Sequence, residues 1–536
     1  MTSRFLKYAI AGLTGFGLTA AMTAGAQADT PKRGGVLEFV VASQAPSFDS
    51  HIETTFGTVH PIAPFYSLLI RLDPTDPASG RFECDVCEGE VPSPTNDGKT
   101  YTFKIRKGIE FHDGTPLTAH DVAATYKKII FPPEGIASAR KSFYTMVDSV
   151  EATDDETLVF NLKYPSGAFI PVLADPFATI YSKKDLDTHG YTWHQTNVNG
   201  TGPFRFQEYQ PGNFVSGVRN DKYHHEGRPY LDGFRAVVAT QMSVRVQAIR
   251  GDRAAIEFRG FPPSARDELV NALGDQITVQ ESDWNCVLIV TPNHEKKPFD
   301  DARVRRALTL ALDRWGGSQY LSRIAIVKTV GGIGFPNHPL SANEEELTQI
   351  AGYWKDIEAS RAEARRLLKE AGHENLSFTL SNRDVDQPYK VVGTWLIDQW
   401  RRIGVNVTQQ VSPTPVFYDI MRRQKTFDVS IDFNCQSIVN PIADVSKFIP
   451  GGGSNYANFT DEITSNLYDQ LSRELDQDKQ RALMRQLEKR VLDEHASQFI
   501  TLWWYKINPH RSYVKGWKVT ASHYLAQQLD HIWLDR

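Results

Sequence analysis

Strand-like and helix-like segments alternate along almost the whole of this 536-residue chain, and no repeat or long disordered linker interrupts them. Val36–Ser43, Val287–Val290 and Ile500–Tyr505 have the β-branched and aromatic composition of strands. Val391–Ile403 and Asp478–His495 repeat their apolar residues with helical spacing. This mixture predicts an α/β or α+β fold with two or more lobes. Because no Pro/Gly-rich joint divides the chain, we expect several passes of the chain to connect the lobes.

Local signals predict where two of the helices begin. Thr118 and Asp121 have the spacing of a capping box, so a helix should start at this point. Asp300 or Asp301 should cap a second helix, which we expect to continue through Asp313.

The N-terminal segment has the layout of a secretory signal peptide. Arg4 and Lys7 give a basic start, Tyr8–Gly25 is apolar or small, and Ala26–Ala28 fits the small-x-small cleavage rule. A membrane anchor is the weaker alternative, because the run holds four Gly and three Thr and is short of the ~20 apolar residues that a span needs. We therefore expect residues 1–28 to be removed after export.

Composition limits the compartments in which the mature chain could act and the partners that it could bind. The first cysteine is Cys84, so no thiol near the cleavage point can carry a lipid, and we expect a free, soluble periplasmic protein. The formal net charge is −5 for the full chain and −7 without Arg4 and Lys7, and the charges are dispersed, which argues against nucleic acid or a membrane surface as a partner.

Cys84, Cys87, Cys286 and Cys435 should pair in an oxidising compartment. Four cysteines allow three pairings, and the sequence leaves the choice open. We favour Cys84 with Cys87 because the pair is local, which leaves Cys286 to meet Cys435. A thioredoxin-like redox role for Cys84 and Cys87 is disfavoured, because such motifs open a helix and this one precedes a hairpin.

Motifs for catalysis, nucleotides or metals are absent from the sequence. Ser93 stands where a phosphate-binding loop needs glycine, and neither Gly-x-Ser-x-Gly nor His-Glu-x-x-His occurs. His224 and His225 lie in a polar stretch, which predicts a solvated loop rather than a metal site. We expect no enzyme activity and no cofactor. A secreted hydrolase with a dispersed carboxylate pair stays as an alternative, because such pairs form only in the fold.

The run Asp97–Tyr126 (DGKTYTFKIRKGIEFHDGTPLTAHDVAATY) resembles the signature region of the family 5 extracellular solute-binding proteins, the dipeptide and oligopeptide receptors of ABC importers. Further segments that resemble the family follow in its order; they are Gly34–Leu37, Thr201–Phe204, Asn220–Asp232, Pro298–Arg314, Leu367–Gly372 and Asp476–Arg481. The resemblance covers nearly the full mature chain.

The resemblance implies a two-lobe periplasmic binding protein fold of class II type, with an extra β-rich subdomain in the first lobe. It places lobe I at 29–283, the subdomain at about 62–195, lobe II at 284–498 and a return to lobe I at 499–536. Trp284–Val290 and Ile500–Tyr505 would be the two hinge passes. The lobes would close over a ligand and present it to a membrane permease, which favours a monomer.

Six residues are the candidate ligand contacts by their positions; they are Gln44, Trp284, Asn285, Asn434, Ser437 and Trp504. The indoles would stack on the ligand, and the amides and the hydroxyl would bind its polar groups. Core packing is the alternative role for any single aromatic residue.

One departure from the family pattern bears on the ligand. Peptide-binding members carry an Asp that pairs with the α-amino group of the peptide, and Ser437 stands at that position here. A buried ammonium needs a charged partner, and Asp432 and Asp444 are out of register. The ligand is therefore a peptide or a non-peptide solute such as an opine, an oligosaccharide or a nickel chelate. An exported chaperone-like or sensory protein with the same cleft is a further alternative.

Overall fold

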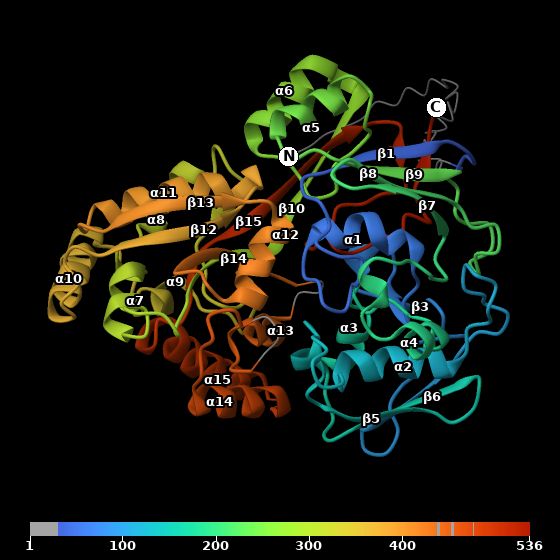
Figure 1. Cartoon of the computed structure of the whole chain (residues 1–536), viewed down its shortest axis with the longest axis horizontal. Helices are drawn as coiled ribbons and strands as arrows, with labels where there is room; N and C mark the ends of the chain where they lie inside the picture. The colour runs from blue at the N-terminus through green and yellow to red at the C-terminus, as the bar shows by residue number, and fades with distance from the viewer. Residues whose placement is uncertain (1–29, 437–439, 452–454, 475) are drawn as a thin grey trace, which may run out of the picture.

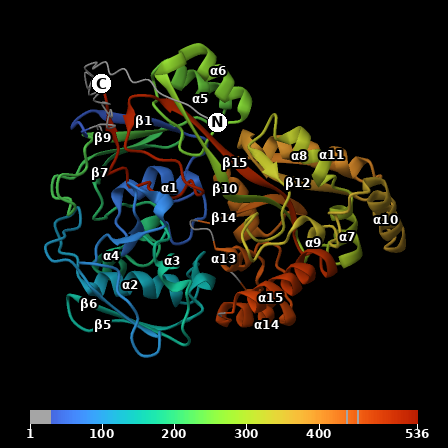
Figure 2. The ribbon, with the colours of Figure 1, turned by 180° about the vertical axis from the view of Figure 1, so that it is seen from behind.

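The computed structural model describes residues 30–436, 440–451, 455–474 and 476–536. These residues form two α/β lobes that lie side by side (Figures 1 and 2). The two-lobe fold expected from the sequence is confirmed. None of the helices in the described ranges is long and apolar enough to cross a membrane.

The first lobe is built on a four-stranded sheet with the order β1-β9-β8-β7. The two strands β1 and β9 are parallel, with Val36 opposite Gly233, and the other pairs are antiparallel. Its strands are β1 (Val36–Val41), β7 (Phe204–Gln210), β8 (Phe214–Arg219) and β9 (Gly233–Val238), and its helices include α1 (Phe56–Ile62), α5 (Met242–Arg250) and α6 (Pro263–Leu273).

A second, antiparallel sheet in the first half of the chain has its own core. Helix α2 (Ala119–Ile130) lies next to it, and the predicted capping box of Thr118 and Asp121 is present. Tyr126 of this helix packs edge-on against Phe160 of the sheet, with ring centroids 5.1 Å apart. The strands are β4 (Thr100–Lys104), β6 (Thr157–Leu162) and β5 (Val147–Ala152), in this order; nearby lie β2 (Ile70–Leu72), β3 (Phe82–Cys84), α3 (Phe169–Leu173) and α4 (Lys183–His189).

The second lobe contains a six-stranded mixed sheet with the order β11-β15-β10-β14-β12-β13. Its strands are β10 (Ile277–Pro292), β11 (Val327–Thr329), β12 (Ser377–Arg383), β13 (Asn406–Ser412), β14 (Val429–Cys435) and β15 (Phe499–Arg511). The main helices are α7 (Ala302–Leu310), α8 (Arg314–Leu321), α10 (Ile357–Glu370), α11 (Val391–Arg401), α14 (Glu462–Arg473) and α15 (Gln477–Lys489).

Two long strands, β10 and β15, run antiparallel between the lobes (green and red in Figure 1). Near the first lobe Ile277 faces Arg511, and within the second lobe Val290 faces Phe499. The backbone of Arg511 donates to Ala255 of the first lobe over 2.8 Å. The expected strand Val287–Val290 is therefore only part of a 16-residue element. Polar residues in its first half concealed the strand signal.

The predicted helix from Asp300 or Asp301 through Asp313 is wrong at its end. Asp301 is the N-cap, but helix α7 stops at Leu310. Asp313 instead begins helix α8, where its carboxylate accepts a hydrogen bond from the backbone of Gly316 over 2.8 Å. An aspartate is better placed at a helix start than inside a helix, because its side chain competes for backbone donors.

Candidate functional site

Direct contacts between side chains of the two lobes show that they are closed on each other. Ser43, just after β1, donates to Thr414 of the second lobe over 2.6 Å. Arg422 of the second lobe forms an ion pair of 3.0 Å with Glu53 of the first. The chemistry at this boundary is therefore defined by groups that come from both lobes.

Two buried arginines, one from each lobe, occupy the centre of the boundary. Arg259 belongs to the first lobe, and Arg383 is the last residue of β12. The Cζ atom of Arg259 lies 4.7 Å from the Phe56 ring and 5.7 Å from the Tyr389 ring. The Cζ atom of Arg383 lies 5.4 Å and 5.1 Å from the same two rings. Their exposed fractions are 1% and 0%. We call these two residues the arginine pair.

Local structure holds the surroundings of the arginine pair in place. Thr55 caps helix α1, so that its hydroxyl and the ring of Phe56 are fixed at the start of the helix. Gly260 has a φ of +114°, and a Cβ atom there would lie 2.9 Å from the carbonyl oxygen of Ile507. This glycine allows the chain to approach β15 and places Arg259 beside that strand.

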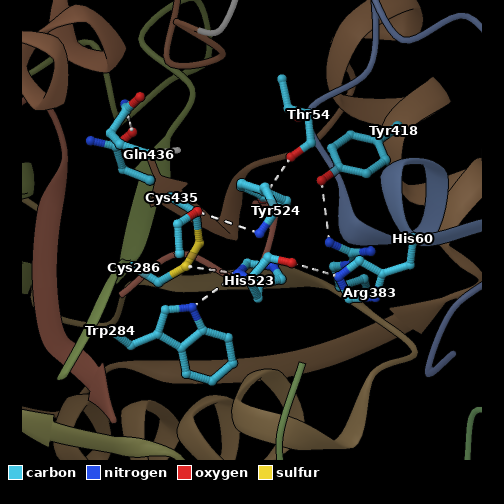
Figure 3. The surroundings of a disulfide bond; sticks show 12 residues. Thr54, His60, Trp284, Cys286, Arg383, Tyr418, Cys435, Gln436, His523 and Tyr524 are labelled. Carbon is cyan, nitrogen blue, oxygen red and sulfur yellow. Dashed lines mark hydrogen bonds between the residues drawn. A yellow bond between two sulfur atoms is a disulfide. The ribbon is translucent and has the colours of Figure 1, made fainter. Parts of the chain in front are cut away.

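Arg383 is hydrogen-bonded only to neutral hydroxyl groups within the described chain. It donates to Tyr418 over 3.2 Å, to Thr55 over 3.1 Å and to Thr414 over 3.2 Å, and it lies 3.5 Å from Ser43 Oγ (Figure 3 shows the bond to Tyr418). Its Nε atom is buried without a partner. No carboxylate therefore neutralises this guanidinium directly.

Arg259 has more unpartnered N–H groups than Arg383 within the described ranges. Its Nε and Nη2 atoms are buried and have no hydrogen-bond partner in the described ranges. The Cζ atom lies 5.0 Å from the Trp504 ring and 5.9 Å from the Trp284 ring. Burial lowers the pKa of Arg259 to about 10, which leaves the guanidinium charged at neutral pH.

Three acidic side chains near the boundary are already ion-paired. Each of three carboxylates has its own cation; the pairs are Glu53–Arg422 at 3.0 Å, Glu257–Arg245 at 3.0 Å and Asp432–Lys447. Lys506 adds a further buried amine, 5.9 Å from the Trp284 ring, and burial lowers its pKa to about 7. The boundary therefore holds more basic than acidic groups.

The structure brings two of the predicted ligand contacts together. Trp284 and Trp504 pack edge to face with ring centroids 5.0 Å apart. The indole N–H of Trp284 donates to Nδ1 of His523 over 2.9 Å (Figure 3), whereas that of Trp504 is buried without a partner. Trp504 thus keeps a free donor beside Arg259.

The other predicted contacts lie in different places. Asn434 lines a cavity between the lobes, and its side-chain nitrogen donates to the carbonyl oxygen of Asp444 over 2.8 Å. Asn285 is buried, and its backbone N–H donates to Ala521 over 2.6 Å. Gln44 donates to Tyr209 of the first lobe over 3.0 Å and does not join the arginine pair. Ser437 lies outside the described residues.

Two cavities follow the lobe boundary. A small one of about 30 Å³ is lined by Thr54 and Arg140 from the first half of the chain and by Phe433 and Asn434 from the second lobe. Phe433 also packs against Arg383, with the Cζ atom 5.8 Å from the ring. Phe143 lines this cavity together with a larger one of about 420 Å³. Only the ring of Phe433 therefore separates Arg383 from the smaller cavity.

Both favoured disulfides are present. Cys84 is bonded to Cys87, and Cys286 is bonded to Cys435. The second bond links the facing positions of β10 and β14, and Nδ1 of His523 lies 3.7 Å from Cys286 Sγ (Figure 3).

One cluster of ligand-type atoms lies away from the boundary. Nε2 of His224 and Nε2 of His225 lie 3.0 Å and 2.9 Å from Oδ1 of Asp85. The prediction of a solvated loop is wrong, because the His224 side chain is only 4% exposed. Burial by itself raises the pKa of Asp85, but Arg71 and the two histidines hold it far below its usual value. These hydrogen bonds account for the cluster without a metal, although its atoms have the residue types of metal ligands.

Neither arginine of the pair was singled out from the sequence. Arg383 ends a strand and is followed by Asp384, and Arg259 stands before a glycine, so neither position carries a motif. A guanidinium without a carboxylate partner is visible only after all the neighbours are placed.

Two α/β lobes that close on each other across two long antiparallel strands are the architecture of a bacterial solute-binding protein. The model of the bacterial extracellular solute-binding proteins, family 5 (middle region), matches residues 89–455, and the chain belongs to this family.

Relatives and solved structures agree with this assignment. The oligopeptide-binding protein AppA of Bacillus subtilis is 29% identical over 420 residues, which cover 72% of this chain and 70% of AppA. The glutathione-binding protein GsiB of Pectobacterium atrosepticum is 28% identical over 58% of each chain. The structure of AppA with a nonapeptide superimposes with a TM-score of 0.81 at 20% identity, covering 95% of this chain and 100% of AppA. The structure of AgaA from A. tumefaciens R10 with agropinic acid superimposes with a TM-score of 0.80 at 19% sequence identity. The superposition covers 94% of this chain and 99% of AgaA.

Proposed function

We propose that this protein is the periplasmic solute receptor of an ABC importer, which captures a peptide-sized polar solute between its lobes. The observation that carries the proposal is the set of unpartnered donors at the lobe boundary, on Arg259, Arg383 and Trp504. Buried donors without acceptors are unfavourable, so a solute that supplies acceptors would stabilise the closed form. A membrane permease would then receive the closed, loaded protein.

The division of the chain follows the same proposal. Residues 1–28 are the signal peptide, 29–283 form lobe I with its subdomain at about 62–195, 284–498 form lobe II and 499–536 return to lobe I. The protein acts as a soluble monomer and not as an enzyme. Glu53, Glu257 and Asp432 near the boundary are ion-paired, which leaves these three poorly suited to act as a general acid and base.

Similar proteins bind different solutes, which supports a solute-capturing function for this protein but does not select one ligand. AppA is described as binding oligopeptides, GsiB as binding glutathione, and AgaA was solved with agropinic acid. The larger cavity of about 420 Å³ falls within the range of small-ligand sites. A solute of this size could extend from the arginine pair past Phe433 and Phe143.

The test uses mature protein freed of bound solute by unfolding in urea and refolding with both disulfides intact. Melting temperatures are measured with di- to pentapeptides, opines, oligosaccharides and metal chelates, and small-angle scattering follows lobe closure. A solute that binds only the folded state raises the melting temperature as its concentration rises. Chemical turnover of the bound compound, or normal solute uptake in a deletion strain, would contradict the proposal.

A further inference from the structure

We propose that the solute is an organic acid with at least two negative charges, held by Arg259 from the first lobe and Arg383 from the second. This inference rests on the proposed function and specifies its substrate class. It follows from three observations, on charge, on hydrogen bonds and on the arrangement of the two lobes.

The charges at the boundary do not balance. Neither Arg259 nor Arg383 forms a salt bridge within the described ranges, while Glu53, Glu257 and Asp432 each have a cation of their own. Burying an uncompensated guanidinium is strongly unfavourable. An anion between the two arginines would remove this penalty for both of them.

The unpartnered hydrogen-bonding groups around the pair are mostly donors. They are Nε and Nη2 of Arg259, Nε of Arg383 and Nε1 of Trp504. The exceptions include Oδ1 of Asn508, which lies beside Gly260, and Oε1 of Glu257, whose other oxygen is already paired with Arg245. A guanidinium presents its N–H groups in a planar fork that matches carboxylate or phosphate oxygens. Donors in this arrangement select a solute rich in anionic oxygen.

Two carboxylates near the arginine pair are not available to a solute ammonium, because each already has a cation. Asp432 is paired with Lys447, and Glu53 with Arg422. Asp444 is buried, and burial raises its pKa well above the usual value, which disfavours its charged form. Ser437, the residue at the position of the amine-binding aspartate, carries no charge. Acidic groups, and not an α-amine, therefore dominate recognition.

The position of one arginine on each lobe makes the anion a condition for closure. Burial is the main cause of the lowered pKa of Arg259, and the nearby positive charge of Arg383 lowers it further, which is the sign of repulsion between like charges. Closing the empty cleft brings these two cations together, and a dianion between them replaces repulsion by attraction. The same contact thus selects the solute and closes the lobes.

The experiment compares matched compounds on the refolded, solute-free protein by thermal shift and calorimetry. The acidic set is glutarate, citrate and glycerol 2-phosphate; the set without net charge is glutaramide, trialanine and maltotriose; cadaverine is the cation. We expect one or more acids to raise the melting temperature and to reduce the radius of gyration, and the neutral and cationic compounds to do neither. The carboxylates and the phosphate are separate arms, so the result also names the acidic group.

Substitutions connect any binding to the arginine pair. Arg259→Met and Arg383→Met should each weaken binding of the responding acid at least about tenfold, while Arg259→Lys, which keeps the charge but loses the fork, should weaken it less. Arg235→Met is the matched control, because Arg235 also stacks on a ring (Phe214, 3.6 Å) but lies on the first-lobe sheet. The melting temperature of each solute-free variant shows whether it is folded.

The outcomes separate the two proposals. Binding of trialanine or glutaramide as tightly as the acids, or unchanged acid binding by folded Arg259→Met, overturns the anion inference and leaves the receptor function standing. Failure of every acid to bind overturns the inference as well. If in addition deletion of the protein affects no solute uptake, the receptor function also fails.

Discussion

Cys286 and Cys435 stand at directly facing positions of β10 and β14, and their disulfide ties the strand that crosses between the lobes to the second-lobe sheet. The residue before Cys286 is Asn285, whose carbonyl accepts from the backbone of Gln436 over 3.1 Å. Gln436 is the last described residue before Ser437. The disulfide therefore holds Gln436 against β10.

Removal of this disulfide should destabilise the protein strongly. It closes a loop of 149 residues, for which the chain-entropy argument gives about 5 kcal/mol, against about 2 kcal/mol for the three-residue separation of Cys84 and Cys87. Urea unfolding of the double variants Cys286→Ser/Cys435→Ser and Cys84→Ser/Cys87→Ser measures both losses. Equal losses in the two variants would show that loop length does not set the effect.

The ion pair between Glu53 and Arg422 should contribute to closure, because its members come from different lobes. Glu53→Gln leaves Arg422 unpaired only in the closed form, so solute affinity should fall about tenfold or more while the open form is unaffected. Isothermal calorimetry measures this change. Glu83→Gln is the control, since Glu83 pairs with Arg71 over 2.9 Å within the first half of the chain. Equal loss of affinity in both variants would contradict the prediction.

Lys506 should make stability depend on pH. Burial lowers its pKa to about 7, so between pH 7 and its unfolded pKa of about 10.4 the unfolded chain binds more protons and stability rises with pH. Below pH 7 the full cost of burying the charge is present. The groups around it, His60 and His523, have lowered pKa values through burial and are neutral at pH 7.

Lys506→Met should therefore stabilise the protein, by about 2–5 kcal/mol at pH 6 and by less at pH 9. Thermal unfolding across this range, with Lys518→Met as the exposed control, measures the difference. A stabilisation that does not change with pH would mean that packing, and not the charge, is responsible.

Asp85 should be a large source of stability, since it is buried and accepts hydrogen bonds from His224 and His225. Asp85→Asn should cost about 3 kcal/mol at pH 7, because the two histidines lose their charged partner and Arg71 loses the attraction of a nearby negative charge. The folded pKa lies far below the unfolded value, so the contribution is present above about pH 4 and is lost on acidification.

Urea unfolding at pH 7 and pH 3 checks this sign, because the difference between wild type and Asp85→Asn should shrink at the lower pH. Asp187→Asn, which breaks an exposed pair with Lys183, should cost no more than about 0.5 kcal/mol. A difference for Asp85→Asn that grows at pH 3 would contradict the assignment.

Local patterns determined much of the fold. The capping box of Thr118, the start of α7 at Asp301 and the core of β15 depend on contacts a few residues apart, which the sequence displays directly. The error at Asp313 also concerns local contacts. The same aspartate could end the helix that begins after Asp301 or begin a new helix, and in the structure it begins α8. The pairing of Cys84 with Cys87 was favoured because the two are close in sequence, and the pairing of Cys286 with Cys435 was what remained.

Only some residues of the candidate site could be predicted from the sequence. Trp284 and Trp504 were singled out from the sequence, and they meet because their strands pair in β10 and β15. Arg259 and Arg383 were not, because what distinguishes them is the absence of a carboxylate partner, and that depends on every neighbour from both lobes. The sequence by itself determined many of the elements, the family resemblance and the local pair Cys84–Cys87, which depend on local spacing and composition. Only the tertiary structure decided which charges are balanced, because burial and pairing are properties of residues brought together from distant parts of the chain.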